Sequence, residues 1–160
     1  MAEKRLIEDK INSVLNGDKQ KIALDFAAFM RTNGFSIEGD ENDYGWGVSY
    51  KGNGAGFIKF SGVETELWLW FGRDCDFGSS VPTDDDLKET IWSGVVICPQ
   101  STCSPPDSCE GSKEGYKIFG KEFDRTCYCP LGFYNPDAKT MENIKKLMIL
   151  LKNKVDTQCT

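Results

Sequence analysis

The chain contains no histidine. Histidine is the commonest general base and a frequent ligand of catalytic zinc, so its absence removes the usual basis for acid–base or zinc-assisted catalysis. GxSxG, P-loop and GxGxxG patterns are missing as well. Gly52, Gly54 and Gly56 lie between two expected strands, where a hairpin turn fits better than a phosphate-binding loop. The sequence nominates no catalytic residue, and we expect a binding protein rather than an enzyme.

Long apolar runs and basic stripes are also missing. No stretch reaches the length of roughly 20 residues that a membrane-spanning helix needs, and the acidic N-terminal residues are unlike a secretory signal. The net charge is −6, which disfavours a nucleic-acid partner. We interpret the lysines near the C-terminus as a solvated helix face: Lys145, Lys146, Lys152 and Lys154. We therefore expect a cytoplasmic protein with neither a membrane nor a nucleic-acid partner.

The 160 residues suit a single domain, residues 1–160, and 39% of them are hydrophobic, which is enough for a core. Two helices are expected at the N-terminus, because apolar residues recur at helical spacing in two short segments. The first ends at Asn16-Gly17. The second begins at Asp18 and ends at Asn33-Gly34.

Alternating residues predict a three-stranded antiparallel meander after these helices. The strands begin near Tyr44, Gly56 and Glu66, and the segment 52–54 is expected to form the first turn. In the third strand, Trp68 and Trp70 point to the face opposite Leu67, Leu69 and Phe71. Both faces are apolar, so the sheet is either covered by helices on both sides or binds a ligand on its aromatic face. Helices on either side in the sequence favour burial.

A middle helix and a C-terminal helix complete the expected α+β fold. Thr83 and Asp86 fit a capping box at the start of the middle helix, and the acidic residues around them suit a helix N-terminus. The turn 135–137 precedes the C-terminal helix, and late strands are expected around Gly120 and at 131–134. The expected buried stripes are Leu87, Ile91, Trp92 and Val95 in the middle helix, and Met141, Ile144, Leu147, Met148 and Leu151 in the last helix.

Cysteines cluster around the Pro- and Ser-rich loop at 97–115. A loop of this length needs a reason inside a compact domain, and four thiolates around zinc supply one. We predict a structural zinc ion bound by Cys98, Cys103, Cys109 and Cys127, with Cys129 as the alternate fourth ligand. The spacing lacks CxxC knuckles, so three alternatives remain: a redox pair, disulfides, or free thiols. A zinc ion with four thiolates has no open position and is therefore not catalytic.

Two sequence segments carry a resemblance to a known family. The segment 118–124 followed by Cys127, and the segment 133–138 leading into a lysine-rich helix, resemble an uncharacterised family of small bacterial cysteine-containing proteins. The segments at 23–26 and 92–98 are similar too. More distantly, the order of elements resembles the YdhG-like domains, which implies a curved antiparallel sheet and no catalytic residue. The family's cysteine loop is shorter than the loop here, where the segment 104–108 lengthens it.

These observations lead to one main hypothesis and two alternatives. The main hypothesis is a zinc-stabilised binding module that takes a small molecule or a protein on an aromatic sheet face, formed by Trp46, Tyr50, Trp68 and Trp70. The first alternative is a thiol-based redox or metal sensor. The weaker alternative is an enzyme that uses carboxylates in a cleft beside the meander.

Overall fold

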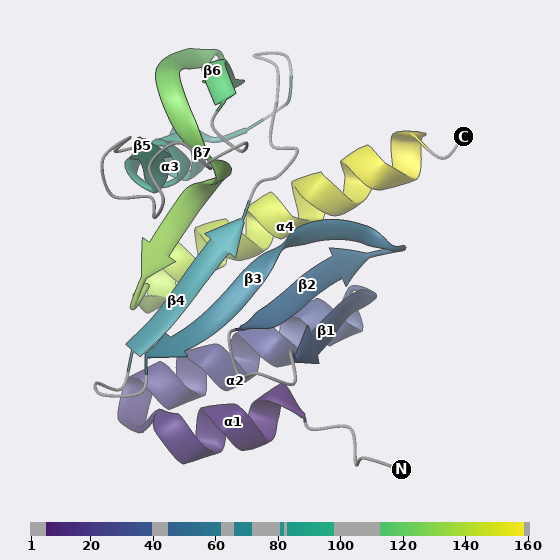
Figure 1. The fold of residues 1–160 in the computed structure, drawn as a ribbon, viewed down its shortest axis with the longest axis vertical. Helices are drawn as coiled ribbons and strands as arrows, with labels where there is room; N and C mark the ends of the chain where they lie inside the picture. Colours follow the sequence, from purple (N-terminus) through teal and green to yellow (C-terminus); the bar gives the residue numbers. More distant parts are fainter. Residues whose placement is uncertain are drawn as a thin grey trace, which may run out of the picture.

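The computed structural model describes residues 6–39, 45–61, 66–71, 81, 83–97 and 113–158. Within these ranges the protein has an α+β fold, as the sequence predicts (Figure 1). The helices are α1 (Ile7–Val14), α2 (Gly17–Thr32), α3 (Asp85–Ser93) and α4 (Ala138–Gln158). The strands are β1 (Phe35–Gly39), β2 (Trp46–Tyr50), β3 (Asn53–Ser61), β4 (Glu66–Phe71), β5 (Val95–Ile97), β6 (Lys113–Ile118) and β7 (Lys121–Tyr134). No helix in this part of the chain combines the length and apolar character of a membrane span.

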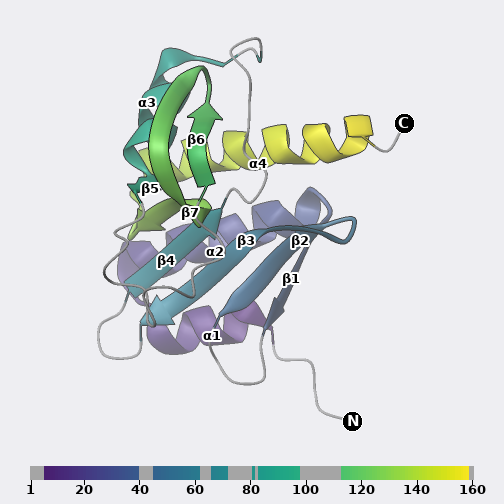
Figure 2. The ribbon, with the colours of Figure 1, turned by 45° about the horizontal axis from the view of Figure 1, so that its top comes forward.

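The sheet follows the order β1-β2-β3-β4-β7-β5, with β6 paired to β7, and every pairing is antiparallel. The meander predicted from the sequence is confirmed as β2-β3-β4. The late strands are confirmed as β6 and β7. Strand β7 has 14 residues and runs from the hairpin that it forms with β6, beside α3, down to β4 (Figure 2). The first end of β7 therefore belongs to the hairpin, and its last residues belong to the main sheet.

Helices α2 and α4 lie on the same face of the meander. The ring of Phe26 on α2 is 6.0 Å from that of Phe71 on β4, and the hydroxyl of Tyr50 on β2 meets Asp156 on α4. Figure 1 shows both helices behind the strands, with the opposite face of the sheet toward the viewer. Because burial alternates along β4, with Leu67, Leu69 and Phe71 inside, the predicted division of that strand into two faces is confirmed.

Two tight turns set the register of the hairpins. Lys51 and Gly52 have φ values of 48° and 80°, and Phe119 and Gly120 have 49° and 83°. Tyr50 pairs with Asn53, and Ile118 with Lys121, so each turn has two central residues with positive φ, as in a type I′ turn. The first turn therefore lies one residue earlier than the sequence suggested.

The ends of α3 also differ from the prediction. Asp84, rather than Thr83, caps the helix: its carboxylate accepts a hydrogen bond of 2.7 Å from the backbone N–H of Leu87. Gly94 ends the helix, so Val95 begins β5 instead of extending the helical stripe. The strand β1 was not predicted, because its pattern after the end of α2 is short and only half alternating.

Candidate ligand-binding face

The outer face of the sheet, which points away from α2 and α4, brings together aromatic residues from three strands. Lys59 on β3 pairs with Trp68 on β4, and Trp68 pairs with Tyr134 on β7. In the next row, Phe57 pairs with Trp70. Directly paired residues share a face, so all five side chains lie on the outer face. The meander and the last residues of β7 together position this set.

The aromatic rings on this face contact one another in two arrangements. The rings of Trp68 and Trp70 are nearly parallel, with an interplanar angle of 10° and centroids 6.3 Å apart. Tyr134 meets Trp68 edge to face, at 85° and 4.9 Å between centroids. Both geometries suit the ring quadrupole. The contacts fix the indoles against each other and leave part of their surface open, since both tryptophans are half-buried.

A groove of about 340 Å³ opens over these rings. We call it the aromatic groove; it is lined by Phe57, Lys59, Phe60, Trp68 and Trp70. Phe57 is 39% exposed, and Tyr134 beside the groove is 50% exposed, which is high for such large apolar side chains. Among the described elements, the covering helices lie on the other face of the meander (Figure 1). The expectation that helices cover both faces therefore does not describe this part of the chain.

The described lining of the groove carries one charged side chain, and a carboxylate lies beside it. Lys59 is the one charged side chain among the described lining residues, and it stands across from Trp68. The carboxylate of Glu66 lies at the start of β4, where it accepts a hydrogen bond of 3.4 Å from the indole Nε1 of Trp68. This bond holds one edge of the indole. The groove therefore combines apolar walls with one cation.

Two residues that the sequence placed on this face lie elsewhere. Trp46 and Tyr50 are only 6% and 7% exposed and point to the helix-covered face, because Trp46 pairs with the buried Ile58. The prediction of one shared aromatic face is therefore wrong for these two residues. Tyr50 donates its hydroxyl to Asp156, and burial, followed by that hydrogen bond, raises the pKa of the phenol.

Sequence reasoning missed three residues of the face: Phe57, Lys59 and Tyr134. The alternation of β3 already placed Phe57 and Lys59 on a common side, and the small number of residues between β3 and β4 in the sequence was a signal that this side continues to Trp68. For Tyr134 there was no such signal. Its strand pairs with β4 across more than sixty positions of sequence.

The cysteines of the predicted zinc site fall mainly outside the described residues. Cys98, Cys103 and Cys109 lie outside the described residues, whereas Cys127 and Cys129 belong to strand β7. The described neighbours of the cysteine loop, Ile97 and Lys113, both pair with Thr126, the residue before Cys127. Within the described ranges, no three Cys, Asp or Glu side chains gather as metal ligands would.

The two segments that carry the family resemblance have structural roles here. The segment 118–124 contains the turn between β6 and β7 and the first residues of β7. The carbonyl of Ile118 accepts a hydrogen bond of 2.8 Å from Nε1 of Trp92, and the ammonium of Lys121 lies 5.1 Å from the centroid of the same indole. The segment 133–138 joins β7 to α4. There Asp137 accepts a hydrogen bond of 2.7 Å from the backbone N–H of Thr140 and so caps the helix.

In comparisons with protein-family models, with curated proteins and with solved structures, none matches this chain.

Proposed function

We propose that this protein is a binding module whose aromatic groove takes a flat, apolar small molecule with one negative charge. The observation that carries the proposal is the set of half-buried, mutually packed indoles beside a single lysine. Indoles held this way offer a large apolar surface at little entropic cost. The conformation of Trp68 is already fixed by its contacts with Trp70, Tyr134 and Glu66.

Size and charge narrow the ligand class. The groove volume of about 340 Å³ lies at the lower end of the range for small-molecule sites, of roughly 300–1,000 Å³. A ligand with two fused rings fits such a volume. A cationic ligand would also favour the indole faces, but Lys59 repels it. An anionic group of the ligand would pair with Lys59, the only charged side chain in the described lining.

The structural zinc ion is a separate part of the proposal. Cys98, Cys103, Cys109 and Cys127, with Cys129 as the alternate, would tie the cysteine loop to β7. The pairing of both Ile97 and Lys113 with Thr126 supports this assignment, since it brings both ends of the loop to the strand that carries Cys127. The likeness to the small bacterial cysteine-containing family and to YdhG-like domains stays a prediction, as do the thiol-sensor alternative and the cytoplasmic location.

The test uses 2-naphthoate as the probe and 2-naphthamide as its uncharged counterpart. Binding is measured by isothermal titration and by the shifts of the indole N–H signals in NMR spectra. We expect naphthoate to shift the signals of Trp68 and Trp70 and leave that of Trp92 unchanged. Lys59→Met should weaken naphthoate binding about tenfold, a change of about 1.4 kcal/mol, and leave naphthamide binding unchanged.

The matched control is Lys117→Met, which removes a lysine from the exposed side of β6, where it pairs with Glu122. It should bind naphthoate like the unaltered protein. Trp68→Phe is the second variant, since a smaller ring preserves the apolar character and protects the fold. If naphthoate shifts neither indole, or if Lys59→Met and Lys117→Met bind it equally, the groove does not bind the proposed class.

A further inference from the structure

A second cavity lies on the opposite side of the sheet, between the β2–β3 hairpin and the last turns of α4. Its volume is about 220 Å³, and it shares no lining residue with the aromatic groove. We call this space the hairpin cavity. Phe35 and Tyr50 line it from the sheet, and Leu151 and Val155 line it from α4. The ring centroids of Phe35 and Tyr50 are 5.1 Å apart, so the two rings form one aromatic wall.

The inner part of the lining is apolar, whereas the outer part is polar. Phe35, Tyr50 and Leu151 are only 4%, 7% and 8% exposed, although each of them lines the cavity. Asn53 and Gln158 also line it, and both of these amide residues are exposed. The apolar side chains therefore surround the body of the cavity, and the two amides stand at its mouth.

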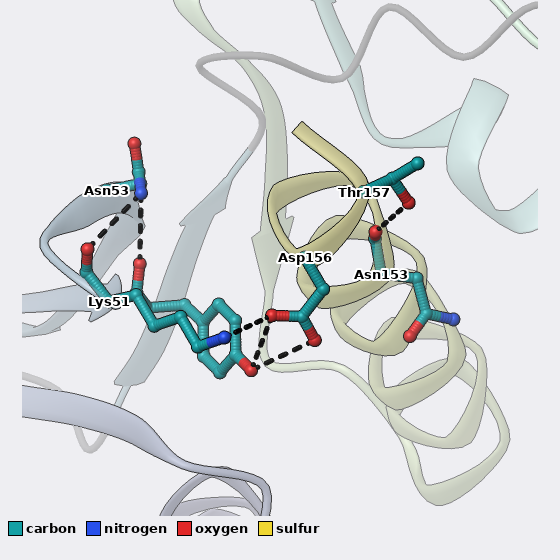
Figure 3. A network of polar contacts seen from close by, with 6 residues as sticks. Lys51, Asn53, Asn153, Asp156 and Thr157 are labelled. Carbon is teal, nitrogen blue, oxygen red and sulfur yellow. Dashed lines mark hydrogen bonds and ion pairs between the residues drawn. The ribbon is translucent and has the colours of Figure 1, made fainter. Parts of the chain in front are cut away.

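Polar contacts hold the hairpin against α4 beside this cavity. Both carboxylate oxygens of Asp156 accept from the hydroxyl of Tyr50 at 3.1 Å, and one also accepts from Nζ of Lys51 at 2.7 Å. Figure 3 shows the carboxylate of Asp156 reaching from α4 to the hairpin. Nδ2 of Asn53 donates to the carbonyls of Tyr50 and Lys51 at 3.4 and 3.3 Å and stabilises the turn. The walls of the cavity are therefore fixed without a ligand.

The charged groups around the hairpin cavity already have partners. Asp156 and Lys51 are paired with each other at 2.7 Å. Lys154 is the only charged residue in the described lining, and it takes part in an interaction of its own. A charged ligand would lose its hydration against apolar walls and would have to compete for a counter-ion, which costs free energy. The hairpin cavity therefore favours an uncharged ligand.

We propose that the hairpin cavity binds an uncharged molecule built on a single six-membered ring with one hydroxyl group. An apolar cavity of roughly 150 Å³ is large enough for benzene, so about 220 Å³ accommodates one ring with a short substituent and is small for two fused rings. The ring would lie against the aromatic wall of Phe35 and Tyr50, where offset or edge-to-face contacts are favourable. The hydroxyl would bond to the amide of Gln158, because the amide of Asn53 already holds the turn. This site does not depend on the function proposed for the aromatic groove.

The test titrates the full chain with benzyl alcohol and, separately, with benzoate, its charged counterpart, and follows backbone amide signals by NMR. Benzyl alcohol should shift the amides of Ala55 and Val155, which line the cavity, and leave the indole signals of Trp68 and Trp70 unshifted. Benzoate should bind there about fivefold more weakly, because its charge must be desolvated. Gln158→Leu should weaken the binding of benzyl alcohol about threefold through the loss of one hydrogen bond.

Val155→Phe is the second variant, because it fills the cavity and leaves every charge in place. It should abolish the shift that benzyl alcohol causes at Ala55. Leu150→Phe is the matched control: it adds the same ring to α4 at a partly buried position outside the lining and should bind normally. Gln158→Leu lies at the exposed end of α4 and keeps the proposal testable if Val155→Phe does not fold.

Four results would each overturn the proposal. Benzyl alcohol could produce no shifts at the cavity, or shift only the indoles of the aromatic groove. Benzoate could bind at the cavity as tightly as benzyl alcohol, or folded Val155→Phe and Leu150→Phe could bind benzyl alcohol equally. Because the readout is resolved by residue, failure here leaves the naphthoate experiment at the groove unaffected.

Discussion

Asn135 and Leu67 exchange two hydrogen bonds across the junction of β4, β7 and α4. The backbone N–H of Leu67 donates to Oδ1 of Asn135 at 2.9 Å, and the backbone N–H of Asn135 donates to the carbonyl of Leu67 at 2.8 Å. Asn135 has a φ of 42°, a left-handed conformation that asparagine adopts more readily than most residues. One side chain therefore joins the strand of the indoles to the start of the C-terminal helix.

Asn135→Ala should lower the free energy of unfolding by about 2 kcal/mol, because it leaves the N–H of Leu67 without its acceptor and strains the backbone. Urea denaturation followed by circular dichroism measures this change. Asn135→Asp keeps an acceptor and is expected to cost less than half as much. Equal stability of Asn135→Ala and the unaltered protein would show that the two hydrogen bonds between Asn135 and Leu67 contribute nothing to stability.

Gly56 on β3 lies where no side chain fits. A Cβ atom at this position would come within 2.0 Å of the backbone oxygen of Trp70 and within 2.9 Å of the Cα of Phe71. Gly56→Ala must push β3 and β4 apart, and we expect a loss of about 3 kcal/mol in the free energy of unfolding, at the upper end for an overpacked site. Chemical denaturation measures the loss.

Gly47 on the neighbouring strand β2 provides the matched control. A Cβ atom there would meet its nearest neighbour, the backbone oxygen of Glu38, at an ordinary 3.7 Å. Gly47→Ala should change stability by less than about 0.5 kcal/mol, or raise it slightly, because alanine restricts the unfolded chain. If both variants lose the same stability, the close approach of β3 and β4 is not the cause.

Acid should destabilise the start of α3 through Asp84. The hydrogen bond from the backbone N–H of Leu87, followed by that from Lys146, lowers the pKa of Asp84 below its ordinary value of 3.8. A carboxyl whose pKa is lowered by folding contributes stability above its unfolded pKa, and that contribution is lost as the pH falls through the folded pKa. We therefore expect the free energy of unfolding to fall as the pH drops below about 4.

Asp84→Asn separates the charge of this residue from its capping. Asparagine caps a helix about as well as aspartate, so stability near neutral pH should change little, whereas the loss in acid should become smaller. Denaturation curves collected between neutral pH and the acid range measure the difference. An unchanged acid dependence would assign the loss to the other acids with lowered pKa values, Asp86, Asp137 and Asp156.

Zinc, if present as proposed, should be found at about one atom per chain when the protein is purified under reducing conditions without added metal. Elemental analysis with a parallel count of free thiols measures this, and four of the seven thiols should be protected. A chelator should then lower the melting temperature, because binding of the metal is coupled to folding.

Cys127→Ser should remove the metal, whereas Cys75→Ser, outside the cluster in sequence, should retain it. A protein with no metal and seven reactive thiols would contradict the zinc assignment. A protein with no metal and fewer reactive thiols would favour the disulfide or redox alternative instead.

The contrast between β4 and β2 shows what the sequence could predict. Alternation within β4 gave the two faces correctly, because neighbouring side chains of a strand always point to opposite faces. It could not show which face of β2 joins which face of β4. That choice depends on the turn at Lys51-Gly52 and on the bulge between Val48 and Ser49. A shift of one residue exchanges the faces, and Trp46 and Tyr50 were misplaced for this reason.

The sequence could not predict the pairing of β7 with β4, for a different reason. Local patterns identify a strand, but Trp68 and Tyr134 meet only after the whole middle of the chain has been placed. Two residues of the candidate site, Trp68 and Trp70, therefore followed from periodicity, and the contribution of Tyr134 required the tertiary structure. The same holds for the contact of β2 with α4, which Tyr50 and Asp156 make.

The pairing of Phe71 with Leu131 also bears on how this protein tolerates changes in length. The chain leaves β4 at Phe71 and returns to the position beside it at Leu131, so the segment between them, which includes α3, β5 and β6, is a long excursion from this pair of residues. The entropy of closing such an excursion grows only slowly with its length. Insertions and deletions in related chains are therefore expected to gather between these two residues, and Phe57, Lys59 and the two indoles would persist through them.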